Sequence, residues 1–248
     1  EGFADQSLDY LQFSAATGIA SISGSRTGNQ LLSYFGKINY RWSDRYLASA
    51  TLRVDGSSRF GEENRFGLFP AFTLGWRIDK EAFMANVKFI SNLKLRSGYG
   101  IVGNQEIGDE ARFGKYATNY GTLSGNRIIG TAYAITGVNT GNLPSGYVAT
   151  QLANVNLKWE STSEINIGID FGFFNESITG SFDYFGRTTK DILTRPPYPG
   201  AMGEGSYQYV NGATMKNKGF EIVLGYRGDV GPVSFNVTGS VTSFHDRI

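Results

Sequence analysis

Seven tyrosines in two long, irregular stretches are the residues of this sequence best suited to binding chemistry. A tyrosine ring presents an apolar face and a polar hydroxyl, which suits stacking against a sugar ring. Both stretches are rich in glycine, and loops carried by a rigid scaffold are where binding residues usually lie. The candidate ligand-binding residues are Tyr116, Tyr120, Tyr133 and Tyr147 in the first stretch (103–158) and Tyr198, Tyr207 and Tyr209 in the second (191–213). The alternative role of these rings is to pack the loops together or against a partner protein.

Residues for catalysis or metal binding are scarce. The chain has one histidine, His245, and no cysteine, so no second imidazole or thiolate is present to complete a metal site or an acid–base pair. No GxSxG, HExxH or P-loop pattern occurs. The acidic pairs Glu62–Glu63 and Asp109–Glu110 lie in loop segments and are interpreted as solvated charge. We therefore expect no enzyme, no metal and no cofactor. The net charge of +1 predicts no attraction for nucleic acid.

The two loop stretches lie between segments in which apolar and polar residues alternate with a period of two, and the chain has eight such segments. In the first segment, for example, Ile38 and Tyr40 flank the polar Asn39. Such alternation indicates β-strands with one apolar and one polar face. The strands are predicted near 32–42, 46–55, 68–79, 93–102, 160–173, 178–190, 214–227 and 233–244, with a short helical turn within 80–91.

Within the alternating runs of these strands, the charged side chains lie on one face. That face carries Lys37, Arg41, Arg53, Asp55, Arg77, Asp79, Lys94, Arg96, Glu164, Asp170, Asp183, Arg187, Glu221 and Arg227, and the apolar positions of the same runs carry none. Strands of about ten residues, tilted near 45°, span roughly 24 Å, close to the apolar band of an outer-membrane barrel. Short turns also alternate with long loops, as in such barrels. The sequence thus predicts an all-β fold, a transmembrane antiparallel β-barrel with short periplasmic turns and long extracellular loops.

Aromatic residues beside the short turns agree with this orientation. Trp42, Tyr46, Phe173 and Tyr226 lie where a girdle at the inner membrane interface would place them. The alternative is that they belong to the core of a soluble β-protein. No run of about 18 apolar residues predicts a transmembrane helix, and the opening EGFADQSLDY lacks the features of a signal peptide.

Several motifs resemble one known family. The runs LLSYFGKINYRW, DGSSRFG, FPAFTLGWRI, NLKLRSGYG, LKWE and MKNKGFEIVLGY are similar to the barrel of SusC/RagA-type TonB-linked outer-membrane transporters, in the family's order across residues 31–248. Nothing in the sequence resembles the family's plug domain or TonB box. We therefore expect residues 1–248 to form part of one TonB-dependent receptor β-barrel domain, about eight strands of a barrel of about 22.

The resemblance implies a function and a location. It implies a nutrient importer in the bacterial outer membrane that contacts lipid and takes up an oligosaccharide or peptide. The implied partners are the TonB complex and a SusD-like surface lipoprotein. Three alternatives remain: a binding or adhesion barrel without transport, a TonB-dependent siderophore or cofactor receptor, and a soluble β-rich carbohydrate-active enzyme. Within the DGSSRFG segment, we predict a turn-stabilising contact between Asp55 and Arg59.

Overall fold

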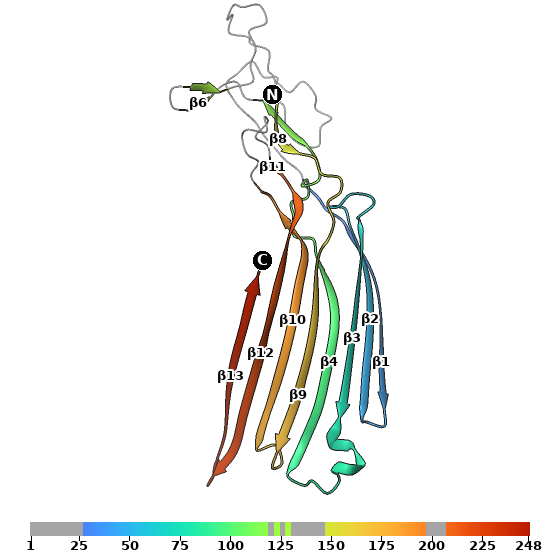
Figure 1. Cartoon of the computed structure of the whole chain (residues 1–248), viewed down its shortest axis with the longest axis vertical. Helices are drawn as coiled ribbons and strands as arrows, with labels where there is room; N and C mark the ends of the chain where they lie inside the picture. Colours follow the sequence, from blue (N-terminus) through green and yellow to red (C-terminus); the bar gives the residue numbers. More distant parts are fainter. Residues whose placement is uncertain (1–26, 119–121, 125–126, 130–146, 197–206) are drawn as a thin grey trace, which may run out of the picture.

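The computed structural model describes residues 27–118, 122–124, 127–129, 147–196 and 207–248, and its main body is one curved antiparallel sheet of eight long strands (Figure 1). All eight predicted strands are present. They follow the spatial order β1-β2-β3-β4-β9-β10-β12-β13, so each long strand pairs with the next one along the chain. Their bounds are β1 (Leu31–Trp42), β2 (Tyr46–Ser57), β3 (Phe66–Arg77), β4 (Ile90–Asn104), β9 (Glu160–Phe173), β10 (Ile178–Thr194), β12 (Val210–Val230) and β13 (Val233–Arg247).

The two long loop stretches are not wholly irregular, contrary to the prediction. Three short strands form a second sheet in the order β11-β8-β5: β5 (Lys115–Thr118), β8 (Tyr147–Leu152) and β11 (Tyr207–Gln208). The strands β6 (Thr122–Ser124) and β7 (Arg127–Ile129) pair with each other. Strands of two to six residues are too short to produce a detectable alternation, which is why the sequence did not reveal them.

The connection between β3 and β4 is helical, but differs in detail from the single predicted turn. It contains two 3-10 helices, η1 (Ile78–Lys80) and η2 (Ala82–Met84). In the part of the chain that the structure describes, no helix is long and apolar enough to cross a membrane.

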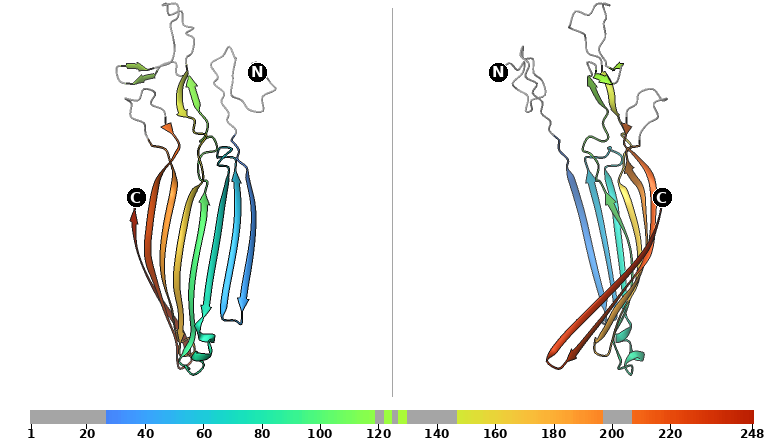
Figure 2. Two further views of the ribbon diagram at one scale, coloured as in Figure 1. Left: turned by 45° about the vertical axis from the view of Figure 1, so that its right-hand side comes forward. Right: turned by 90° about the vertical axis from the view of Figure 1, so that its left-hand side faces the viewer.

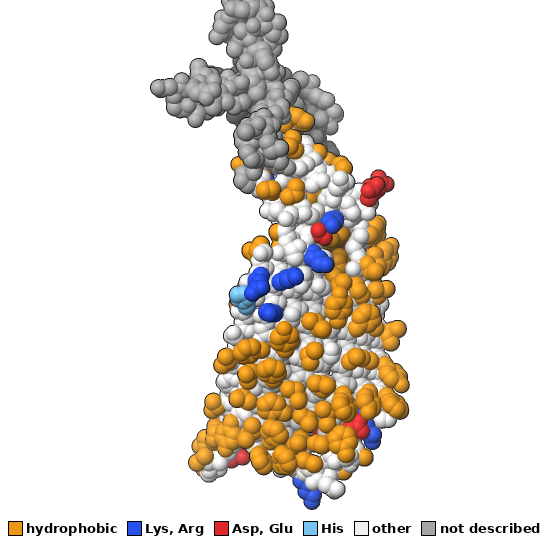
Figure 3. All heavy atoms as spheres, in the orientation of Figure 1, with side chains coloured by type: hydrophobic (Ala, Val, Ile, Leu, Met, Phe, Trp, Pro, Cys, Tyr) orange, Lys and Arg blue, Asp and Glu red, His pale blue; other side chains and the backbone are white. Residues whose placement is uncertain are grey.

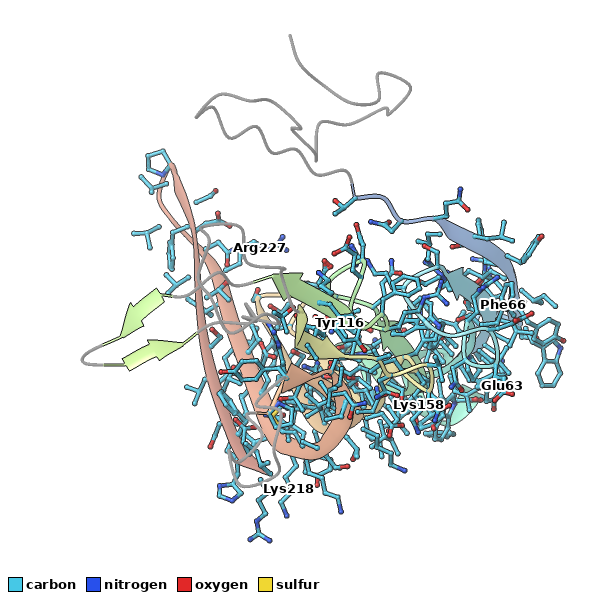
Figure 4. All side chains as sticks on the ribbon, turned by 90° about the horizontal axis from the view of Figure 1, so that it is seen from above. Glu63, Phe66, Tyr116, Lys158, Lys218 and Arg227 are labelled. Atoms are coloured by element: carbon cyan, nitrogen blue, oxygen red, sulfur yellow. The ribbon has the colours of Figure 1, made fainter. Side chains whose placement is uncertain are left out.

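The register of the large sheet aligns residues of the same face into continuous rows across its strands. Leu95, Ile169 and Phe182 lie in one row, and the row beside it holds Arg96, Gly168 and Asp183. The apolar rows form a broad band on the convex side (Figure 3), where Ile38 is 74% exposed and Leu74 is 64% exposed. Figure 4 shows Lys218 projecting from this convex side and Arg227 lying on the concave side. The side views show how the sheet twists along its length (Figure 2).

The largest buried cluster of the described residues lies at the loop end of the large sheet. There the β3–β4 ladder stops at Ala71 and Gly100, although β2–β3 pairing continues to Phe66. Pro70, beside the last pair, has no N–H to donate to a ladder. Aromatic side chains fill this gap, and the Trp159 Nε1–H donates to the Arg65 carbonyl at 3.0 Å. The buried cluster consists of Phe60, Phe69, Ile107, Ala111, Leu157 and Trp159.

The turn end of the sheet has its own aromatic cluster. Trp42 and Tyr46 stack with ring centroids 5.6 Å apart, and Tyr46 stacks on Trp76 at 6.5 Å. The Glu81 carboxylate accepts hydrogen bonds from the Tyr46 hydroxyl (2.8 Å) and from Trp76 Nε1–H (3.0 Å). Of the four residues predicted to form an aromatic girdle, Trp42 and Tyr46 belong to this cluster. Phe173 instead stacks on Phe89 at 6.2 Å, and Tyr226 contacts Phe235 at 5.8 Å.

Candidate functional site

The predicted tyrosines that the structure describes lie at the loop end, on and beside the small sheet. Tyr116 in β5 is opposite Ala149, Tyr147 in β8 is opposite Thr118, and Tyr207 begins β11. Tyr116 is 69% exposed and Tyr207 is 44% exposed, so both rings are accessible. Tyr120, Tyr133 and Tyr198 lie outside the described residues.

Arg195 brings two of these tyrosines together. Its guanidinium lies 4.7 Å from the ring centroid of Tyr207 and 5.3 Å from that of Tyr209, within the range of cation–π attraction. Tyr209 is only partly exposed and packs against the buried cluster, and its carbonyl accepts a hydrogen bond from Asn154 Nδ2 at 2.8 Å. Tyr209 therefore supports the loop end, whereas Tyr207 presents a ring to solvent. Sequence reasoning missed Arg195, because no motif or spacing marks a cation that meets two rings only after folding.

Gln151, in strand β8 of the small sheet, forms hydrogen bonds with the loop that follows β4. Its side chain is buried, and its amide nitrogen donates to the carbonyls of Glu110 (2.9 Å), Ala111 (3.3 Å) and Phe113 (2.8 Å). These bonds satisfy carbonyls that the irregular backbone leaves without ladder partners. Gln151 is a second residue that the sequence did not single out.

The predicted Asp55–Arg59 contact was wrong. Asp55 instead accepts hydrogen bonds from Arg53 Nε on both carboxylate oxygens, at 2.7 and 2.8 Å. Residues two apart in a strand share a face, so Asp55 stays beside Arg53 because β2 continues to Ser57. Arg59, beyond the strand, reaches across to Asp109 at 2.8 Å and to the Gln105 carbonyl at 3.0 Å. The DGSSRFG segment is thereby tied to the loop after β4.

The concave wall below the loops is polar and ion-paired. Arg96 donates to Asp170 at 2.8 and 3.0 Å and to Asp183 at 2.9 Å. Farther along the wall, Arg187 donates to Glu164 at 2.7 Å. These groups are partly exposed, so the ions keep some hydration while they cross-link three strands.

Open hollows run along this wall. Two hollows of about 610 and 590 Å³ share Glu164, Asn166 and Arg187, and a third of about 430 Å³ shares Asn166 with them. Carboxylate, amide and guanidinium groups there can exchange hydrogen bonds with a polar solute. Among the described residues, no group of three His, Asp or Glu side chains is arranged to hold a metal ion. The wall therefore offers hydrogen bonding and charge to a solute.

Comparison with known proteins places the chain in one family. A family model described as "TonB dependent receptor-like, beta-barrel" matches residues 2–247. The chain is 40% identical over 199 residues to the TonB-dependent receptor SusC of Bacteroides thetaiotaomicron, covering 80% of this chain and 18% of SusC. It is 36% identical over 198 residues to the TonB-dependent receptor P39 of Formosa agariphila, covering 80% of this chain and 17% of P39.

A solved structure agrees with this assignment. The RagAB peptide importer in its "open-open" state superposes with a TM-score of 0.71 at 27% identity, covering 99% of this chain and 25% of that chain. This chain spans less than a fifth of the length of SusC and P39, so its eight strands correspond to part of a larger barrel. The predicted SusC/RagA-type resemblance, the all-β barrel fold and the outer-membrane location are confirmed. The chain belongs to the TonB-dependent receptor-like β-barrel family of bacterial outer-membrane proteins.

Proposed function

We propose that the whole protein imports an oligosaccharide or a peptide across the outer membrane, energised by TonB and assisted by a SusD-like surface lipoprotein. The observation that carries the proposal is the division of the sheet into an exposed apolar convex band and an ion-paired concave wall, in a chain 40% identical to SusC. A wall of this kind suits a water-filled or plugged lumen through which a polar solute passes. RagAB, the solved relative, is described as a peptide importer. The role is transport, with no chemical change to the cargo.

The loop end supplies the proposed contacts with cargo or lipoprotein. Tyr116 and Tyr207 have exposed rings, and Tyr209 with Arg195 holds Tyr207 in place. Tyr120, Tyr133, Tyr147 and Tyr198 belong to the same proposal through their positions in the two long stretches. The concave hollows lie below these loops and would receive a solute after it leaves them.

The test is uptake by a bacterium that lacks the whole gene and is complemented by defined versions of it. The probes are fluorescently labelled oligosaccharides, labelled peptides and ferric siderophores, supplied separately. We expect the intact gene to restore uptake of an oligosaccharide or a peptide. A version without its TonB-interacting segment should bind that solute at the surface without internalising it.

The same cells separate the alternatives. Surface binding without uptake by the intact gene would favour an adhesion barrel, and uptake of ferric siderophore alone would favour a siderophore receptor. Purification of the tagged barrel from these cells should also recover a surface lipoprotein. Recovery of the barrel without one would count against the proposed partner.

A further inference from the structure

Five basic side chains gather on the convex face of β10, β12 and β13, toward the loop end of the large sheet. They come from three neighbouring strands, and all five are exposed. In Figure 3 blue side chains lie beside the pale-blue histidine, above the lower part of the apolar band. We call Lys190, Lys216, Lys218, His245 and Arg247 the convex basic patch.

The register places two like charges, those of Lys216 and Arg247, directly opposite each other. Lys216 faces Arg247, and Lys218 faces His245, which accepts a weak hydrogen bond from Arg247 Nε at 3.4 Å. Like charges opposite each other across two strands destabilise a sheet. Among the described residues, no ion pair forms with any of the three lysines or with Arg247. The neighbouring carboxylate of Asp191 pairs with Lys158 instead, at 3.0 Å. Within the described part of the chain, the patch is thus a concentration of positive charge with no paired carboxylate.

The position of the patch relative to the apolar band indicates the depth in the membrane at which the patch lies. Tyr184 and Phe220 face each other in the row just below, and Lys218 lies two residues farther toward the loop end. Two residues of a strand advance about 6.6 Å, so on β10 and β12 the lysines begin where the aromatic side chains of this face end. The loop end is the extracellular side of a barrel of this family. The cations therefore lie at the headgroup level of the outer leaflet.

The residues between the basic side chains of the patch are small. Gly186 faces Lys218 across the ladder, and a Cβ atom added there would meet only Ile165 Cγ2, at 3.4 Å. Thr188 lies opposite Lys216, and Ser161 lies opposite Lys190. Small and hydroxyl-bearing side chains between the lysines leave room for an anionic group to approach and supply further hydrogen-bond donors.

We propose that the convex basic patch binds the phosphorylated headgroup of an outer-leaflet glycolipid. A phosphate there neutralises the opposed cations through charge-assisted hydrogen bonds, while the acyl chains of the same molecule cover the apolar rows below. That continuity favours a lipid over an acidic protein or a free phosphate, because only a lipid meets the patch and the band together. The proposal concerns lipid binding and does not depend on the transported cargo.

The test uses the purified whole protein in detergent micelles, with fluorescent bisphosphorylated lipid A as the probe and phosphate-free lipid A as its chemical control. The test variant is Lys216→Gln/Lys218→Gln. The matched control, Lys80→Gln/Lys88→Gln, removes two exposed lysines at the turn end. Heat modifiability on gels verifies that each variant is folded. Because each lysine near an anionic surface contributes measurably, we expect the test variant to bind the phosphorylated lipid about tenfold more weakly, and the control variant to match the wild type.

Three results would overturn the proposal. The first is equal affinity of the test variant and the wild type for phosphorylated lipid A. The second is equal affinity of the wild type for the phosphorylated and phosphate-free lipids. The third is loss of a co-purifying acidic protein from the test variant with lipid affinity unchanged, which would assign the patch to a protein partner. A failure of solute uptake by the whole cell, in contrast, would leave these lipid affinities unaffected.

Discussion

Arg96 on β4 donates a hydrogen bond to Asp183 on β10 at 2.9 Å, although β9 lies between these two strands. Gly168 of β9 is the residue opposite both of them in the ladders. A Cβ atom at Gly168 would overlap Asp183 Oδ1 and lie 3.1 Å from Arg96 Cζ. The glycine thus lets an ion pair form over a strand, and the pair braces three strands of the concave wall.

Substitution Gly168→Ala should therefore separate Arg96 from Asp183. We expect a loss of about 1–3 kcal/mol, the range for breaking such a network, and a lower midpoint of heat modifiability on gels. The control is Gly98→Ala on the same face, where the added Cβ would make an ordinary contact of 3.7 Å with Thr73 Cγ2. Equal effects of the two alanines would show that the ion pair contributes little.

The sequence predicted the long strands of this sheet and their two faces, because both follow from the type of every second residue. Arg96 and Asp183 were assigned correctly to one face, but their contact depends on a register that links residues 87 apart. The same limit applies to the loop end. The exposed position of Tyr116 could be expected from its loop, whereas the roles of Arg195 and Gln151 depend on backbone that only the fold brings near.

The assignment of the two faces makes a direct prediction at the middle of β1. Ile38 is 74% exposed on the convex side, and Asn39 points to the opposite face. Ile38→Arg should destabilise the inserted barrel by about 2–4 kcal/mol if the residue lies near the bilayer midplane. Asn39→Arg should be far milder. Urea unfolding of the whole protein in lipid vesicles measures both, and equal losses would contradict the face assignment.

The carboxylate at the turn end predicts a pH dependence. Hydrogen bonds from Trp76 and then Tyr46, with the nearby charge of Arg45, hold the pKa of Glu81 below its ordinary value. Because the pKa is lower in the folded state, this stabilisation is present above the pKa of the unfolded chain. It is lost as the pH falls through the folded pKa.

Substitution Glu81→Gln should remove that part of the acid sensitivity. We expect the wild type to lose thermal stability between neutral pH and the acidic side of the Glu81 transition. The variant should start lower at neutral pH and change less over the same interval. The midpoint of heat modifiability across a pH series measures this difference, and parallel curves for the two proteins would rule out Glu81 as the titrating group.

The exposed ring of Tyr116 tests the proposed contact with cargo. Tyr116→Ala removes a ring that is 69% exposed, so the fold should be unaffected while affinity for the transported solute falls about three- to tenfold. Phe113→Ala is the control, because that ring is also exposed but lies against Arg112. Binding of labelled solute to the purified whole protein measures the change. Unchanged affinity in Tyr116→Ala would assign this ring to packing or to the lipoprotein.

Gln151 should control the order of the loop that follows β4. Gln151→Ala leaves the carbonyls of Glu110, Ala111 and Phe113 without their buried donor, at a cost of about 1–3 kcal/mol. Because β4 keeps its own ladder to β9, this cost should appear as local opening and not as loss of the barrel. Amide hydrogen exchange should rise about tenfold or more in residues 108–114 and stay unchanged in β9.

Thr150→Ala on the same strand as Gln151 is the control. It removes only a bond of 3.3 Å to the Lys115 carbonyl and should leave the exchange of residues 108–114 near its wild-type rate. Slow exchange in both variants would mean that the buried cluster alone holds the loop.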